Sequence, residues 1–152
     1  MKKFIKYAAV FLALGLALGV FYREFSKAYG VVHTYTTLGL AHTHFLVLGT
    51  AFTLIIGLVT LYIGKQDDKL FIWAFRLYGT GVLGAGCMMA ARGVLDVLVK
   101  SDKIVFAVSK GANGAISGLS GLFHAVLGVG LVLIFVAWLL NKRSGKISDG
   151  EQ

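Results

Sequence analysis

Apolar residues in this chain are gathered into four long blocks, which short polar or charged segments separate. The blocks cover about residues 4–22, 35–63, 70–99 and 111–140. Each supplies the roughly 20 residues that a helix needs to cross a bilayer, and none shows the alternation of a strand. Because backbone groups in lipid must be satisfied within their own segment, the pattern predicts four transmembrane helices.

The connections predict how these helices are joined. The segment at residues 64–69, GKQDDK, is short and charged, so the second and third helices should form an antiparallel hairpin. The connections at residues 23–34 and 100–110 are longer, and His33 in the first of them should be solvated or interfacial. The predicted fold class is all-α. We expect an up-down-up-down four-helix membrane bundle over residues 1–141, and a disordered cytoplasmic tail over residues 142–152.

The first block has some features of a signal peptide. Three lysines precede its apolar run, and Ala17–Gly19 is a passable cleavage site. The run continues past that site, however, and ends in the charged segment FYREF at residues 21–25 rather than in a polar mature start. We therefore expect a retained helix.

Composition and charge agree with a membrane protein and exclude other classes. Of the 152 residues, 57% are hydrophobic and 14% charged, whereas soluble domains have about 45–50% apolar and about 25% charged residues. The net charge is +8, but the basic residues lie at block ends rather than in a stripe, so no nucleic-acid partner is expected. The chain has no P-loop, no dinucleotide fingerprint and no paired carboxylates at depth. A stand-alone hydrolase or transferase is therefore not expected.

Lysine and arginine counts near the block ends predict the orientation. With a cytoplasmic N-terminus, eight basic residues lie inside and five outside, which favours both termini inside. The inner set is Lys2, Lys3, Lys6, Lys65, Lys69, Lys142, Arg143 and Lys146, and the outer set is Arg23, Lys27, Lys100, Lys103 and Lys110. Membrane lipid is then the main surrounding of the chain.

Three histidines within the predicted spans are the first candidate chemistry, because imidazole is costly to place in hydrocarbon. His42 and His44 in the second helix and His124 in the fourth lie at matching depths, roughly 10–18 Å below the outer surface at 1.5 Å per residue. At about 100° per residue, His42 and His44 point in nearly opposite directions, so at most one of them faces a given ligand.

Glycines share the helix face of two of these histidines: Gly39 and Gly49 with His42, and Gly121 and Gly128 with His124. Glycine above and below an imidazole leaves room for a large flat ligand, and haem is the flat ligand that takes axial imidazoles. We predict one haem b bound by His42 and His124, or by His44 in place of His42. The alternative is that the glycines are helix–helix contacts and each histidine bonds a neighbouring carbonyl.

Haem propionates need cations, and two arginines are candidates. Arg92 lies near the outer end of the third helix, and Arg23 lies just outside the first. An arginine inside a span is a functional candidate. For Arg92, two other roles carry the same weight as propionate binding. It could form an ion pair with Asp96 at i+4, or extend its side chain to the membrane interface.

Four segments carry a first resemblance: VFYREF at residues 20–25, HTHFLVLG at 42–49, ARGV at 91–94 and ISGLSGLFHAVLGVG at 116–130. Together they resemble a family of small bacterial four-helix membrane proteins of unknown function. The resemblance covers about residues 4–140. It implies a multi-pass protein of the bacterial inner membrane and supplies no activity.

The segment AHTHFLVLG carries a second, shorter resemblance. It is similar to helix two of the catalytic subunit of haem–copper oxidases and nitric oxide reductases. There, a histidine in an H-T-x-x-x-x-x-G setting is an axial ligand of the low-spin haem b, and the matching residue here is His42. This chain lacks the further histidines that bind the second haem and copper in those enzymes. The resemblance thus implies one haem b and no oxygen-reducing site.

Three functions remain open. A haem b protein with two axial histidines has no open position, which favours electron transfer or haem handling, although gas sensing also belongs to this class. The second is a copper protein, with His44, Cys87, Met88 and Met89 as soft or borderline ligands. Because consecutive residues of a helix point about 100° apart, the three sulfur-containing residues could not all face one ion. Adaptable packing is the simpler interpretation of these side chains. The third is an assembly or interaction subunit without a cofactor. A respiratory or redox partner and a homo-oligomer are compatible with all three.

Overall fold

The structure is a computed structural model that describes residues 1–32, 35–101 and 109–140. Its elements in chain order are α1 (Lys2–Ala28), α2 (Thr37–His44), η1 (Phe45–Phe52), α3 (Thr53–Tyr62), α4 (Lys69–Lys100) and α5 (Lys110–Leu139). The predictions for His33, for Lys103 and for the tail at residues 142–152 lie outside the described residues.

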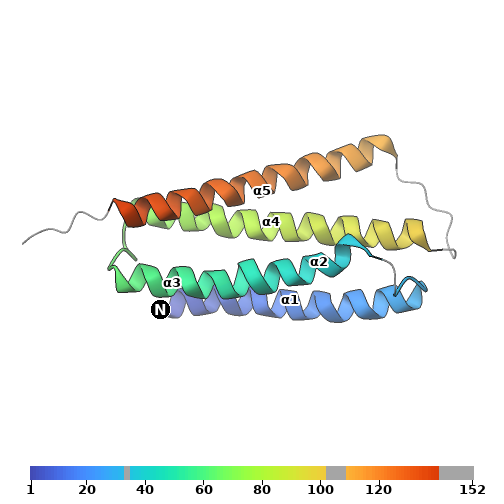
Figure 1. Ribbon diagram of the computed structural model, residues 1–152, viewed down its shortest axis with the longest axis horizontal. Helices are drawn as coiled ribbons and strands as arrows, with labels where there is room; N and C mark the ends of the chain where they lie inside the picture. The colour runs from blue at the N-terminus through green and yellow to red at the C-terminus, as the bar shows by residue number, and fades with distance from the viewer. Residues whose placement is uncertain (33–34, 102–108, 141–152) are drawn as a thin grey trace, which may run out of the picture.

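α2, η1 and α3 continue one another and form a single rod (Figure 1). The described residues therefore form four helical rods, each antiparallel to the next along the chain. Each rod is long and apolar enough to cross a membrane, and the described residues include no strand. The predicted all-α, four-helix membrane architecture is therefore confirmed. α1 differs from the prediction at its C-terminal end, because the helix continues through the charged FYREF segment to Ala28.

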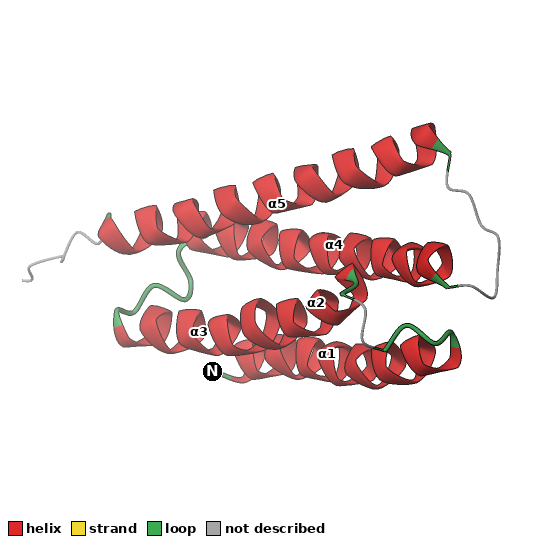
Figure 2. Ribbon diagram, turned by 45° about the vertical axis from the view of Figure 1, so that its right-hand side comes forward, coloured by secondary structure: helices red, strands yellow, loops and turns green. Residues whose placement is uncertain are grey.

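The rods are arranged unevenly. α1 packs along the second rod, the second rod packs on α4, and α5 packs chiefly on α4. α5 leans away from the other helices toward its N-terminal end, in both views (Figures 1 and 2). The N-terminal half of α5 is consequently more exposed than its C-terminal half.

Glycines set how closely these helices approach. A Cβ atom at Gly81 would meet the backbone of Leu127 in α5, and one at Gly93 would meet the backbone of Leu38 in α2. On the other side of the second rod, Gly49 faces the ring of Phe11. Small residues that let backbones come together are how membrane helices pack when lipid offers no hydrophobic driving force.

Polar groups close the helix ends. Asp68 caps α4 by accepting the Phe71 N–H at 3.0 Å, and this bond, with help from Lys65, holds the pKa of Asp68 below its ordinary value. The start of α2 has a cap from a different helix, because Asp96 in α4 accepts both the N–H of Thr37 at 3.1 Å and its hydroxyl at 2.5 Å. The Asp96 carboxylate thereby ties the start of α2 to the C-terminal half of α4.

The π-helix η1 was not predicted from the sequence. It begins directly after His44, and the hydroxyl of Thr50 donates to the carbonyl of Phe45, five residues earlier, at 3.2 Å. The ring hydroxyl of Tyr78 in α4 donates to the carbonyl of Leu48 inside the same segment. Side chains thus bond two η1 carbonyls, and π-helical turns often lie at functional sites.

The close approach of α4 and α5 leads to a stability prediction. Replacing Gly81 with alanine should lower the free energy of unfolding by about 1–3 kcal/mol, because the methyl group would enter the backbone of Leu127. Gly114 is the matched control, since a Cβ there has no heavy atom within 4 Å, and Gly114→Ala should stabilise by up to about 1 kcal/mol through helix propensity. Thermal unfolding in detergent, followed by circular dichroism, measures both; equal midpoints for the two variants would contradict the packing described here.

Candidate functional site

Two of the three histidines come together between helices that are far apart in the sequence. His44 ends α2 and His124 lies in the middle of α5. Their ring centroids are 5.8 Å apart and their planes are inclined by 63°. Two imidazoles that bind one metal ion from opposite sides have centroids roughly 6 Å apart, given metal–nitrogen bonds of about 2.0 Å. The pair therefore has the spacing of a two-histidine site.

The hydrogen bonds of the two rings leave nitrogen atoms free. Nδ1 of His124 lies 2.8 Å from the carbonyl oxygen of Ser120. Because a carbonyl only accepts, Nδ1 carries the proton, and Nε2 of the neutral ring keeps its lone pair. Metal-binding histidines characteristically donate their other ring N–H to a carbonyl in this way.

The His44 ring is more enclosed. Its Nε2 atom is buried and has no hydrogen-bond partner, while the backbone of Val82 in α4 lies within hydrogen-bonding reach of the ring. A buried nitrogen without a partner costs about 1–3 kcal/mol, and such atoms in native structures call for an explanation such as a bound ion or water. Nδ1 of His42 is buried without a partner as well, so what distinguishes Nε2 of His44 is that its ring lies beside His124.

His42 does not take part in this pair. Its ring stacks on Tyr22 of α1, with centroids 6.1 Å apart and planes inclined by 16°, and Gly19 of α1 provides the space. The predicted divergence of His42 and His44 is therefore present. The sequence paired His42 with His124, whereas in the structure the ring of His44 is the neighbour of His124. The reason is that the glycines on the His42 face accommodate α1, since Gly39 faces Tyr22 and Gly49 faces Phe11.

The glycines beside His124 are open. A Cβ atom at Gly121 or at Gly128 would have no heavy atom within 4 Å, in contrast to Gly81 and Gly130, which form the α4–α5 contact. Gly121 and Gly128 lie three residues before and four residues after His124, and so share its face. Within one chain, these two glycines do not serve helix packing, and the space beside the imidazole is available.

The two candidate arginines have different surroundings. Arg92 donates from Nη1 to the hydroxyl of Ser117 in α5 at 2.5 Å, and Asp96 is engaged with α2, so the two do not form the i+4 ion pair. Ser117 is two turns, about 10 Å, from His124, which places a guanidinium near the pair but not against it. Arg23 pairs instead with Glu24 at 3.7 Å on the exposed surface of α1.

The copper candidates on α4 differ in exposure. Cys87 is exposed, and Met88 and Met89 are half-buried on consecutive positions of α4. Within residues 1–32, 35–101 and 109–140, no group of three or more histidine, cysteine, aspartate or glutamate side chains is arranged to hold a metal ion. Cys87 therefore does not join the imidazoles of His44 and His124 in a common ligand set.

Comparison with known proteins places the chain in a family. A family model described as Protein of unknown function (DUF2871) matches residues 1–142. The chain belongs to this family. The match confirms the resemblance of its four sequence segments to small membrane proteins of unknown function. No curated protein and no solved structure matches the chain. The similarity of AHTHFLVLG to haem–copper oxidases stays a prediction, and DUF2871 membership supplies no activity.

Proposed function

We propose that this DUF2871 protein binds one haem b through His44 and His124 and works in electron transfer or haem handling in the bacterial inner membrane. The observation that carries the proposal is the pair itself, two imidazoles from different membrane helices with ring centroids 5.8 Å apart. The proposed arrangement keeps the predicted topology, with both termini cytoplasmic.

The residues around His44 and His124 are compatible with a bound haem. The free Nε2 atoms of His44 and His124 would hold the iron, and the open glycine face of α5 would accept part of the haem. Arg92 is the cation within reach of a propionate, because its bond to Ser117 is to a neutral hydroxyl that a carboxylate can replace. When bound, the haem supplies a one-electron couple, and the chain's contribution is to hold it by two ligands with no open position.

An absorption spectrum of the purified protein, oxidised and reduced, is the direct test. We expect a Soret band and the sharp visible bands of low-spin, six-coordinate haem b, either as isolated or after titration with hemin to one equivalent. A chain that takes up no hemin contradicts the proposal. Metal analysis of the same sample distinguishes the copper alternative, because about one copper per chain without haem would assign the two histidines to Cu(I).

A further inference from the structure

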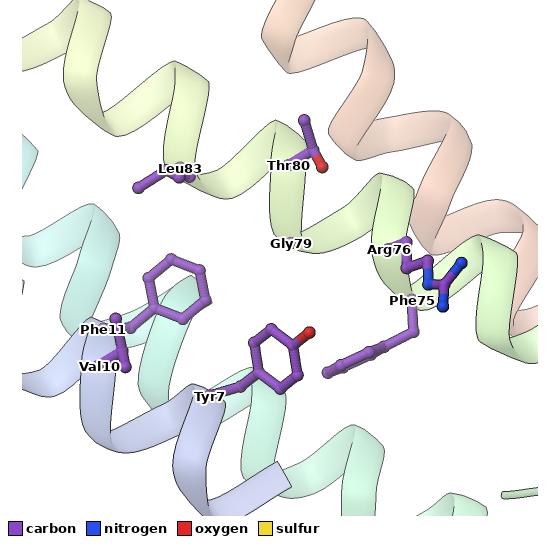
Figure 3. Close-up of a pocket in the computed structure, with 8 residues that line it drawn as sticks. All are labelled: Tyr7, Val10, Phe11, Phe75, Arg76, Gly79, Thr80 and Leu83. Atoms are coloured by element: carbon purple, nitrogen blue, oxygen red, sulfur yellow. The ribbon is translucent and has the colours of Figure 1, made fainter. Parts of the chain in front are cut away.

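A groove runs between α1 and α4, and neither His44 nor His124 lines it. Its larger part has a volume of about 300 Å³ and is lined by residues that include Tyr7, Phe11, Phe75, Arg76 and Leu83 (Figure 3). A second cavity of about 220 Å³ shares Tyr7, Phe75 and Arg76 and adds Lys3. We call these two adjacent cavities, which share three lining residues, the α1–α4 groove. α1 and α4 run in the same direction, so its length follows the helix axes.

The groove has a charged end and an apolar end. Arg76 lies nearer the N-terminal end of its helix than Leu83 does (Figure 3). Lys3 likewise lies at the N-terminal end of α1, before Phe11. No carboxylate lines either cavity. This combination is that of a site for an amphipathic anion whose apolar part extends into the bilayer.

Among the described residues, the guanidinium of Arg76 has no acidic partner. The described residues contain two ion pairs, Arg23 with Glu24 and Lys65 with Asp68, and Arg76 belongs to neither. Its guanidinium lies over the ring of Trp73, with Cζ 5.2 Å from the centroid. Arg76 is seven residues into α4, about 10 Å along its axis. α4 has 32 residues and is longer than the roughly 30 Å hydrocarbon core, so a centred α4 has Arg76 close to the lipid headgroups. An unpaired arginine at this depth is a functional candidate.

We propose that the α1–α4 groove binds one anionic phospholipid. The phosphate lies at the guanidinium of Arg76, with the ammonium of Lys3 nearby, and an acyl chain lies along Phe11 and Leu83. Basic pockets between membrane helices are typical sites for anionic headgroups, and arginine binds phosphate oxygens in pairs. No histidine, cysteine or methionine lines the groove, so the ligands that hold haem in electron-transfer proteins are absent from its lining.

Trp73 provides a local reporter. The chain has two tryptophans, so Trp138→Phe leaves Trp73, beside Arg76, as the single fluorophore. The full-length protein would be reconstituted into phosphatidylcholine vesicles that contain increasing fractions of phosphatidylglycerol with brominated acyl chains, and separately of brominated phosphatidylcholine. We expect brominated phosphatidylglycerol to quench Trp73 at about fivefold lower mole fraction, the preference that one basic residue confers.

Variants at two cations of α4 identify the origin of the preference. Arg76→Gln should bring the ratio of the two quenching curves to about one, whereas Arg76→Lys should retain most of it. Lys69→Gln is the matched control, because it removes the same charge at the same end of α4 from a residue that lines neither cavity. Equal quenching by the two lipids in the unsubstituted background would overturn the proposal, as would an equal loss in Lys69→Gln and Arg76→Gln. The comparison of the two lipids in the unsubstituted background does not depend on whether the variants at Arg76 and Lys69 fold.

Discussion

Replacing either His44 or His124 with alanine is expected to abolish the six-coordinate haem spectrum. Each variant removes one axial ligand, so haem that still binds should have the high-spin spectrum of a single imidazole. The loss of hemin affinity should exceed the roughly 10–100-fold that removal of an outer partner of a metal ligand costs. Titration of the detergent-solubilised variants with hemin, followed at the Soret band, measures both the affinity and the spin state.

His42→Ala is the matched control for these variants. His42 lies on the same helix as His44, two residues earlier, but its ring stacks on Tyr22. The variant should keep the low-spin spectrum and an affinity close to that of the unsubstituted chain. A result in which His42→Ala loses the spectrum and His44→Ala keeps it would restore the pairing that the sequence favoured and contradict the site described here. The double variant His44→Ala/His124→Ala should bind no hemin at the site.

The fold could be predicted because few backbone structures satisfy their hydrogen bonds within lipid. Apolar runs of sufficient length must be helical, and the observed helices begin and end within a few residues of the predicted blocks, apart from the end of α1. There the charged residues that mark the end of the apolar run do not end the helix, because a helix can continue into water. η1 could not be predicted, since the bonds at its carbonyls come from Thr50 and from Tyr78 in α4.

Only part of the arrangement of the three histidines could be predicted from the sequence, and the reason lies in the neighbours of each ring. Helical geometry correctly separated His42 from His44, but the choice between them depends on which neighbours lie on each side. Flanking glycines are the same signal whether they admit a ligand or another helix. The glycines near His42 pack against α1, whereas those near His124 face open space. Only the helix arrangement distinguishes the two cases.

Two further contacts depend on this arrangement. The sequence offered Asp96 as a partner for Arg92, four residues apart on one helix, yet each bonds a different helix instead. Arg76 was overlooked, although a signal was present. It lies within the third apolar block, and the positions three and four residues away on either side carry no acidic residue. An arginine in a span without a local partner should be considered a ligand-binding candidate from the sequence alone.

Gly121→Leu and Gly128→Leu are expected to weaken hemin binding strongly while leaving the fold intact. Each leucine would occupy the open space on the face of His124, and forcing side chains into an occupied volume costs about 1–3 kcal/mol, or roughly 5–150-fold in affinity. Without haem, both variants should unfold at or above the midpoint of the unsubstituted chain, because leucine favours the helix more than glycine by up to about 1 kcal/mol. Hemin titration and thermal unfolding of the haem-free protein measure the two effects separately.

Gly114→Leu is the control for this pair, since it lies on the same helix with equally open space but ten residues from His124. It should leave hemin affinity unchanged. Exposed glycines on a membrane helix can also pack against a helix of a second copy of the chain. If Gly121→Leu and Gly128→Leu keep full hemin affinity but reduce the mass of the detergent-solubilised particle, these glycines form a contact between copies. The space beside His124 would then belong to a partner helix, and the case for haem would depend on the histidine pair alone.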